Sequence, residues 1–369
     1  MFDAIKKIFQ KTTATINLGS GHAGGSTCGI DVGSASIKVV QAKEERGKII
    51  LETYGALALA PFANDAIGKP ARLSEADTAK AITQVLKEAR VTAKNFIVSL
   101  QSNAILVFVV NLPRASEKDL DNVIPNEARK YIPVPLTEVS LDWFIIPDKE
   151  TYNQESTGPS TTMEVLVVAV RNETMQNYQN VLQQAAIPNP TFEIESFATM
   201  RSVLHREIAP VLIVDVGAGF STMMIVEYGI VRIFHVTNRG SAFVTESLAR
   251  SLSVPFEKAE EIKQNADKHP EAAPIITAAH EYLIAEIKRV MVEYEHTQGR
   301  VVSKVILSGG GSSVSGFLAA VAQATGIETI AADPFDKMEA PEFMRPLLKT
   351  SGPEFAVAAG LALKAMLSF

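Results

Sequence analysis

The sequence predicts an α/β fold of two lobes with a phosphate-binding cleft between them. At 369 residues the chain is longer than one hydrophobic core usually organises, so two lobes are expected. Two stretches far apart in the chain, Cys28–Lys38 and Val211–Ile225, share one layout: an apolar strand ending in an acid, a glycine turn with small hydroxyl residues, and a second strand. This layout is typical of a hairpin whose tip holds phosphate, and two facing hairpins would hold the phosphates from opposite sides.

Each residue type in these hairpins has a physical reason to be there. Glycines at the turns allow positive φ and bring backbone N–H groups close to an anion; these are Gly33, Gly217 and Gly219. Asp31 and Asp215 end their strands, where two carboxylates could hold the waters of a magnesium ion bound to the phosphates. The remaining candidate ligands are hydroxyls and one cation, namely Ser34, Ser36, Ser221, Thr222 and Lys38. Either hairpin alone could equally be a buried strand and a tight turn.

A third element strengthens the nucleotide interpretation. Val305–Phe317 is an apolar strand that runs into glycines and a serine, Gly309, Gly310, Gly311 and Ser312. Without side chains, these glycines would let the backbone pass close to a flat base or sugar. The segment has neither the G-K-[ST] of a Walker loop nor the G-x-G-x-x-G of a Rossmann turn.

The three motifs, in this order, resemble the phosphate 1, phosphate 2 and adenosine motifs of the superfamily that contains actin, heat-shock chaperones and sugar kinases. Glu127–Trp143, which reads E-A-R-K-Y-I-P-V-P-L-T-E-V-S-L-D-W, resembles the E-A-x-K-Y-I-P-x-P-L signature of the type IV pilus assembly protein PilM family, a relative of the cell division protein FtsA. The likeness covers roughly residues 27–367.

The resemblance implies an actin-like two-lobed fold with the inserted α+β subdomain of FtsA and PilM. Residues 1–27 would form a tail and flexible linker; 28–103, 187–208 and 353–369 subdomain 1A; 104–186 the inserted subdomain 1C; 209–254 and 301–352 subdomain 2A; and 255–300 subdomain 2B.

The resemblance also implies a function. We expect a cytoplasmic adaptor that binds ATP and Mg²⁺ at the cytoplasmic face of the inner membrane and grips the N-terminal tail of a PilN-like membrane protein. Ala104–Tyr131 would line part of the tail's groove, other pilus platform components would be partners, and membrane association would be peripheral, through the partner. A homo-oligomer, an FtsA-like filament, and a slow ATPase or sugar-kinase-like phosphotransferase are alternatives.

Four further candidates each have a second interpretation. Glu195 matches the glutamate that orients the attacking water in heat-shock chaperones, or it complements a helix dipole as a first-turn acid. Gly240 could face the nucleotide or simply start a helix. Glu260 and Lys263, in A-E-E-I-K, resemble ribose and adenine contacts, or they lie on a solvated helix face.

Composition excludes other classes. The balance of 35 basic and 41 acidic residues gives a net charge of −6, which offers no general attraction to nucleic acid. The lone Cys28 fits a reducing compartment, and no apolar run reaches the ~18 residues of a membrane span. The scattered histidines and the absence of G-x-S-x-G give no support to a zinc site or an acyl enzyme.

Periodicity and caps predict the other elements in order. An amphipathic segment at residues 1–11 could touch a membrane or partner, or fray. Ser116 should cap a helix that Pro125 kinks or destabilises by ~3 kcal/mol and that Pro133 and Pro135 forbid from continuing. Strands are predicted at 48–60, 95–101, 105–112, 139–146, 165–170 and 191–194, and helices at 74–90, 172–186, 195–206, 238–252, 255–298 and 353–367.

Overall fold

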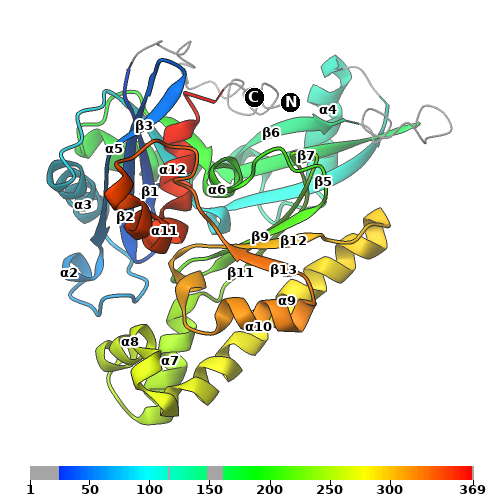
Figure 1. The fold of residues 1–369 in the computed structure, drawn as a ribbon. Coiled ribbons are helices and arrows are strands. Elements are labelled where there is room, and N and C mark those ends of the chain that lie inside the picture. The colour runs from blue at the N-terminus through cyan, green and yellow to red at the C-terminus, as the bar shows by residue number, and fades with distance from the viewer. Residues whose placement is uncertain (1–24, 115–116, 148–160, 368–369) are drawn as a thin grey trace. The chain divides into compact units, whose positions relative to one another are not determined.

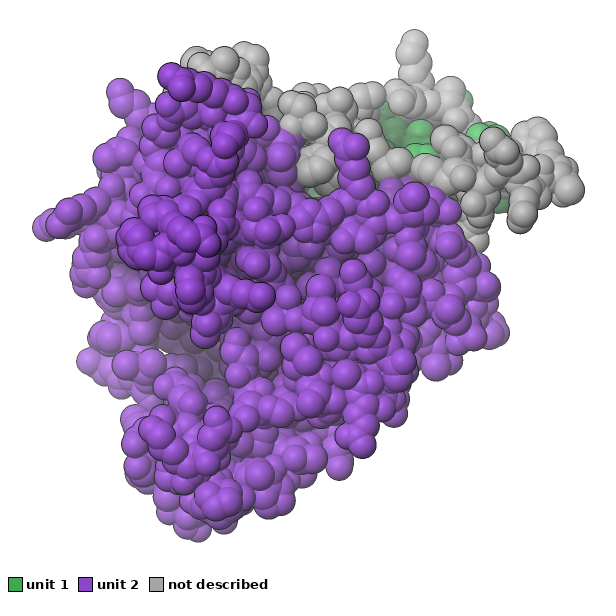
Figure 2. All heavy atoms as spheres, viewed as in Figure 1, with its two compact units in different colours: residues 1–20, 102–180, 368–369 green, residues 21–101, 181–367 purple. Residues whose placement is uncertain are grey.

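The computed structural model describes residues 25–114, 117–147 and 161–367. The described chain divides into two compact units, one formed by residues 102–180 and the other by residues 25–101 and 181–367 (Figures 1 and 2). We call these unit 1 and unit 2. The predicted amphipathic segment at 1–11, the Ser116 cap and most of the 148–162 loop lie outside the described residues.

Unit 1 is a three-stranded antiparallel sheet in the order β5-β7-β6 with a helix on it. Its elements are β5 (Ile105–Pro113), α4 (Glu117–Ala128), β6 (Val139–Ile146), β7 (Thr162–Arg171) and the start of α5 (Asn172–Gln184). α4 buries Leu120 and Ile124 against strand residues such as Val165. Pro125 lies inside α4, as predicted, and the helix continues through it to Ala128. Burial of the α4 face offsets the one hydrogen bond that proline removes.

Unit 2 repeats one sheet topology twice. The first sheet has the order β3-β2-β1-β4-β8 and the second β11-β10-β9-β12-β13. In each, three antiparallel strands are followed by two parallel ones. The strands are β1 (Thr27–Val32), β2 (Ser36–Glu45), β3 (Lys48–Ala58), β4 (Asn95–Leu100), β8 (Thr191–Ile194), β9 (Val211–Val216), β10 (Ser221–Glu227), β11 (Ile230–Thr237), β12 (Lys304–Ser308) and β13 (Glu328–Ala331). Each phosphate-type hairpin thus opens one sheet, β1–β2 in the first and β9–β10 in the second.

Unit 2 contains the predicted helices and three short ones that were not predicted, at residues 60–63, 317–325 and 345–351. In chain order the helices are α2 (Ala60–Ala63), α3 (Glu75–Glu88), α6 (Glu195–Val203), α7 (Ser241–Leu252), α8 (Phe256–Gln264), α9 (Ala273–Gln298), α10 (Phe317–Thr325), α11 (Arg345–Ser351) and α12 (Ala356–Leu363). The predicted helix over 255–298 is two helices, α8 and α9, separated by short 3-10 turns that contain Pro270. The strand β13 was not predicted, because it has four residues and little apolar character.

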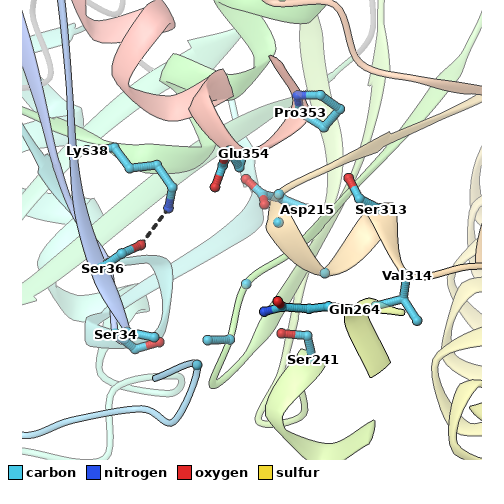
Figure 3. A pocket seen from close by; sticks show the side chains of 18 of the residues that line it. Ser34, Ser36, Lys38, Asp215, Ser241, Gln264, Ser313, Val314, Pro353 and Glu354 are labelled. Atoms are coloured by element: carbon cyan, nitrogen blue, oxygen red, sulfur yellow. Dashed lines mark hydrogen bonds between the residues drawn. The ribbon is translucent and has the colours of Figure 1, made fainter. Parts of the chain in front are cut away.

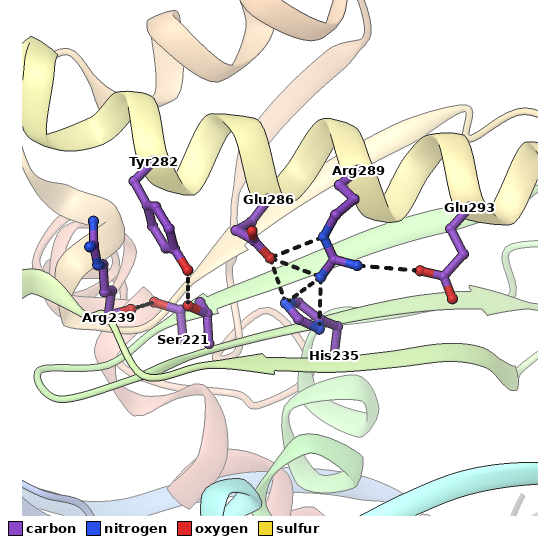
Figure 4. A network of polar contacts seen from close by, with 8 residues as sticks. Ser221, His235, Arg239, Tyr282, Glu286, Arg289 and Glu293 are labelled. Atoms are coloured by element: carbon purple, nitrogen blue, oxygen red, sulfur yellow. Dashed lines mark hydrogen bonds and ion pairs between the residues drawn. The ribbon is translucent and has the colours of Figure 1, made fainter.

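α9 covers one face of the second sheet (Figure 1). The predicted apolar stripe is buried as expected, and its members are Ile276, Ala279, Leu283, Ile287, Val290 and Tyr294. The exposed side of this packing carries a polar network in which Glu286 of α9 lies 2.8 Å from the His235 ring of β11 (Figure 4). Arg289 lies 2.9 Å from the same carboxylate, and the Arg239 guanidinium stacks over Tyr282.

The last helix packs on the first sheet of unit 2 and on α6. α12 packs on the crossover helix α6 so closely that a Cβ on Gly360 would lie 1.8 Å from the Ala198 carbonyl oxygen. Beneath this contact, Arg201 donates to both carboxylate oxygens of buried Glu193, at 2.8 and 2.6 Å, and to the Gly360 carbonyl. Burial alone would raise the pKa of Glu193, but Arg201 and Lys364 outweigh it and hold that pKa below its usual range. The small residues of α12, among them Ala356, Ala359 and Gly360, allow this close packing.

Among the described residues, no helix combines the length and the apolar character that a membrane span requires.

Candidate functional site

A pocket of about 680 Å³ opens in unit 2 between the two repeated hairpins. Its walls come from the β1–β2 turn, the β9–β10 turn, α8, the turn after β12 and the segment that leads into α12. In the close view, Ser36 and Lys38 of β2 lie on one side and Asp215 and Ser313 on the other (Figure 3). Hairpins distant in the chain therefore meet at one cavity.

The carboxylates of Asp31 and Asp215 both line this pocket. Asp31 accepts a hydrogen bond from the Ser99 hydroxyl at 3.1 Å, and Asp215 accepts one from the Thr199 hydroxyl at 3.1 Å. Burial raises the pKa of Asp31. Burial, together with the negative charge of Asp31, raises the pKa of Asp215 to about 6. Because the two negative charges repel each other, a cation between the carboxylates would stabilise both charged forms.

The charges and the number of carboxylates at this site suit a magnesium ion. The described residues contain no group of three or more acids, histidines or cysteines placed to hold a metal. Mg²⁺ is commonly held by one or two carboxylates while water and phosphate oxygens complete its shell. Asp31 and Asp215 fit that mode of binding: burial raises the pKa of both, and the negative charge of Asp31 further raises that of Asp215, so a cation would relieve both effects.

The Lys38 ammonium group and the Ser36 hydroxyl both lie on β2 and contact each other. Lys38 donates from Nζ to the Ser36 hydroxyl at 2.8 Å (Figure 3). Ser34, in the turn, accepts a hydrogen bond from the backbone N–H of Gly219 at 3.2 Å. This contact joins the tips of the two hairpins directly. The hydroxyls of Ser34 and Ser36 and the Lys38 ammonium group face one cavity and form an anion site.

The opposite end of the pocket is formed by α8 and the glycines after β12. Glu260 and Lys263 are 8% and 7% exposed, so the alternative of a solvated charged face is wrong for both. Their side chains pair at 2.7 Å, and each also contacts the Thr245 hydroxyl. Burial lowers the pKa of Lys263. Gly68 closes this end, because a Cβ there would lie 2.9 Å from the Glu260 carboxyl carbon.

The structure brings most of the sequence-predicted residues to the pocket wall. Those that line it are Asp31, Gly33, Ser34, Ser36, Lys38, Glu195, Asp215, Gly217, Thr222, Glu260, Lys263, Gly309, Gly310 and Gly311. Glu195 is buried and begins α6 directly after β8, as predicted. Gly309 has φ of +80°, and a Cβ there would lie 2.4 Å from Asp215 Oδ1. The glycine is therefore needed both for the turn and for the carboxylate beside it.

Four predicted residues do not line the pocket, and each has a structural role instead. Ser221 is buried and donates to the Arg239 carbonyl, and Ser312 donates to the Gly309 carbonyl. Gly240 is pressed against the Gly217 and Ala218 carbonyls, where a Cβ would lie at 2.4 Å. Gly219 holds the hairpin contact to Ser34. Ser241 and Ser313, which were not predicted, line the wall in their place.

Sequence reasoning also missed the contribution of the C-terminal segment. Pro353 and Glu354 line the pocket, and the Gly309 N–H donates to the Pro353 carbonyl at 2.8 Å. The proline at the start of the predicted last helix was the available signal, since it marks a helix start. Only the fold shows that this start lies at the cleft.

The chain is similar in sequence to known protein families. Residues 29–366 match the family model described as Type IV pilus assembly protein PilM. The chain is 23% identical over 284 residues to the cell division protein FtsA of Streptococcus pneumoniae, which covers 72% of this chain and 61% of the relative. It is 24% identical over 206 residues to FtsA of Neisseria meningitidis, which covers 50% of this chain and 49% of the relative. The chain thus spans only about half to three fifths of these relatives.

Solved structures agree on the fold. The structure titled PilM-PilN type IV pilus biogenesis complex superposes with a TM-score of 0.79 at 23% identity, covering 93% of this chain and 99% of that one. The ethanolamine utilization protein EutJ from Carboxydothermus hydrogenoformans gives 0.54 at 15% identity, covering 92% and 89%. MreB 5 of Spiroplasma citri, bound to AMPPNP, gives 0.50 at 8% identity, covering 91% and 94%. The fold is actin-like, as the motifs predicted.

Proposed function

The chain belongs to the type IV pilus assembly protein PilM family, and from this premise we propose that it is a cytoplasmic ATP-binding adaptor of the pilus inner-membrane platform. In this role it binds Mg²⁺-ATP in unit 2 and the N-terminal cytoplasmic tail of a PilN-like membrane protein. The observation that carries the nucleotide part is the convergence of Asp31 and Asp215 on one pocket between the two hairpins. Other platform components and a homo-oligomer remain compatible with the proposal.

The pocket has the size and the groups that a nucleotide needs. Its volume of about 680 Å³ lies within the ~300–1,000 Å³ typical of small-molecule sites. Ser34, Lys38 and the hairpin N–H groups would hold the phosphates, and the two aspartates would hold magnesium through its waters. The bound metal supplies charge neutralisation for the phosphates. The fold neighbour MreB 5, which carries AMPPNP, supports this placement by analogy.

Unit 1 carries features that suit a peptide partner. Within the 104–131 stretch, Leu106, Val123 and Tyr131 are exposed apolar side chains, and the Tyr131 ring stacks on Phe108 at 4.7 Å. Exposed apolar side chains and aromatic rings are typical of protein contacts. We assign the tail contact to this stretch on these exposed side chains, and the PilM-PilN complex among the fold neighbours supports a PilN-like partner.

Glu195 favours a second activity at the same pocket, slow ATP hydrolysis. Its carboxylate belongs to the crossover helix and lines the pocket beside Asp215. A glutamate so placed can orient or deprotonate a water near the terminal phosphate.

Calorimetric titration of Mg²⁺-ATP and of a synthetic peptide of the PilN-like tail, each alone and in the presence of the other, tests the proposal. We expect wild type to bind both, each changing the affinity for the other, because coupling between two sites is reciprocal. Asp215→Ala should lose ATP binding, while the exposed Asp336→Ala should not. Tyr131→Ser should weaken peptide binding and leave ATP binding intact, with the exposed unit 2 variant Val292→Ser as control.

The possible failures are distinct. Absence of ATP binding by wild type would reject the nucleotide site. ATP binding without peptide binding would reject the adaptor role and favour an enzyme. Equal affinities with and without the other ligand would remove the coupling.

A further inference from the structure

A second, smaller compartment adjoins the base end of the candidate nucleotide pocket. It has a volume of about 330 Å³ and lies between the 266–270 connection, the first turns of α9 and the start of α10. Ala266, Asp267 and Ser315 line both cavities, so the two meet at these residues. We call it the side compartment. The phosphate-type hairpins lie at the other end of the main pocket, among residues 33–38 and 217–222.

A side-chain hydrogen bond is found at the boundary between the two cavities. The Ser315 hydroxyl donates to Asp267 Oδ1 at 3.1 Å, and both residues lie toward the exposed side of the site. A single hydrogen bond of this kind contributes about 1 kcal/mol, so a ligand can displace it at little cost. A nucleotide whose phosphates sit at the hairpins would therefore have its base beside an opening into further space.

His280 gives the side compartment its chemistry. The side chain is 3% exposed, lines the compartment and packs on the Phe317 ring at 4.6 Å. Among the described residues, none hydrogen-bonds to its ring nitrogens. Burial, with the nearby Lys263 charge, lowers its pKa to about 4, so the imidazole is neutral at pH 7 and offers one donor and one acceptor. Buried polar groups normally have a partner, and here the compartment is where a partner can come from.

The walls suit a flat, mostly apolar group. Ala273, Ile276 and Ala320 present small or aliphatic side chains around the imidazole. For scale, a cavity of about 150 Å³ accommodates benzene. The side compartment therefore has room for a ring that carries one hydrogen-bonding atom.

We propose that the side compartment receives a planar substituent on the edge of a purine base, with His280 as its hydrogen-bond partner, so that the site accepts purine nucleotides enlarged at the base. This inference rests on the proposed ATP site. It assigns a role in ligand recognition to His280, Asp267 and Ser315. The nucleotide motifs gave these three residues no role.

The experiment titrates wild type with Mg²⁺-ATP, N6-benzyl-ATP and N6-(pyridylmethyl)-ATP. We expect N6-benzyl-ATP to bind within threefold of ATP, and the pyridyl analogue to bind about three to ten times more tightly than the benzyl one. Ala320→Leu fills the compartment and should weaken both analogues at least tenfold while ATP binding stays within threefold. Ala319→Leu, one residue away and not on the wall, should change none of the three. His280→Phe keeps the ring and should abolish the preference for pyridyl over benzyl.

The outcomes separate the two proposals. If wild type binds no ATP, the nucleotide site itself fails and this inference fails with it. If ATP binds but both analogues are weakened more than a hundredfold in wild type, the compartment is not reachable and only this inference is overturned. Equal effects of Ala320→Leu and Ala319→Leu, or an unchanged pyridyl preference in His280→Phe, would also overturn it.

Discussion

The hydroxyl of Ser34 and the backbone N–H of Gly219 lie 3.2 Å apart and bridge two hairpins that are 185 residues apart in the chain. Ser34 also lines the candidate phosphate end of the pocket, whereas Gly219 does not. Contact between the hairpin tips therefore positions the anion site before any ligand arrives, and this reduces the ordering that binding requires.

Removal of that hydroxyl should weaken nucleotide binding. Ser34→Ala loses one hydrogen bond between the hairpins and one phosphate donor, so we expect Mg²⁺-ATP affinity to fall about threefold to tenfold, near 1 kcal/mol. Ser247→Ala is the control, since that hydroxyl bonds only within α7, to the Phe243 carbonyl. Calorimetry should show no change for the control. Wild-type affinity in Ser34→Ala would contradict the assignment.

Magnesium-dependent ATP binding should depend on the ionisation of Asp215. Its pKa of about 6 means that the carboxylate is charged above that pH and protonated below it. We expect the part of the ATP affinity that requires Mg²⁺ to be full at pH 7.5 and to fall as the pH drops through about 6, because a protonated acid holds the metal poorly. Titrations from pH 5 to 8 measure this, and Asp215→Asn should remove the dependence.

The ligand-free protein provides an independent check of the same residue. Because the folded pKa of Asp215 lies above the ordinary aspartate value of 3.8, its contribution to folding is present below about pH 4 and is lost as the pH rises through about 6. Asp215→Asn should therefore be more stable than wild type at pH 7.5, by about 3 kcal/mol, and similar to it near pH 4. Denaturant unfolding at both pH values measures the difference. A variant less stable at pH 7.5 would contradict the burial argument.

The rate of ATP hydrolysis should depend on Glu195. Glu195→Gln keeps the shape and removes the base, so we expect a loss of about 10²-fold or more in the ATP turnover rate with ATP affinity within threefold of wild type. A phosphate-release assay with calorimetry separates the two effects. Unchanged turnover would leave Glu195 as a helix-dipole residue alone.

Packing of α12 on α6 should not tolerate a side chain at residue 360. In Gly360→Ala the new methyl would meet the Ala198 carbonyl oxygen at 1.8 Å, so the helices must separate. We expect a loss of about 3 kcal/mol or more, the upper range for overpacking in a core. Thermal unfolding followed by circular dichroism measures the change, and a melting temperature within two degrees of wild type, on the order of 0.5 kcal/mol, would argue against this close contact.

Two arginines in ion pairs should differ strongly in their effect on stability. Arg201 pairs with Glu193 at 2.6 Å and its side chain is 4% exposed, whereas Arg289 pairs with Glu286 at 2.9 Å and is 51% exposed (Figure 4). Arg201→Met leaves a buried carboxylate without its main partner, and we expect about 3–5 kcal/mol of destabilisation. Arg289→Met should change stability by less than about 1 kcal/mol. Similar effects from both variants, measured by denaturant unfolding, would contradict the comparison.

Local chemistry made much of the fold predictable. The strand boundaries of both hairpins follow from β-branched runs that end at an acid and a glycine. Ser74 caps α3 by accepting from the Asp77 N–H, as the helix start at 74 predicted. The 3.6-residue stripe of α9 is buried where its period placed it. In each case the signal lies within a few neighbouring residues.

The errors came where long-range packing decides. Pro125 costs α4 a backbone hydrogen bond that the sequence registers locally, whereas burial of Leu120 and Ile124, which keeps the helix continuous, depends on the sheet. Ser221 and Ser312 look like phosphate ligands by position, but the register of the strand and the turn directs their hydroxyls to backbone carbonyls. From the sequence, Glu260 and Lys263 could line a site or lie on a solvated helix face. Packing of α8 against Thr245 of α7 buries both side chains.

By itself the sequence determined the paired acidic hairpins, the glycine turn that follows them in the chain, and the apolar faces that form two sheets. Only the tertiary structure decided that Asp31 and Asp215 share one cavity, that Pro353 and Glu354 complete its wall, and that His280 lines a compartment behind it. The physical reason is that a hairpin is specified by contacts among neighbours, whereas the meeting of two hairpins depends on how the repeated sheets pack around α6 and α12.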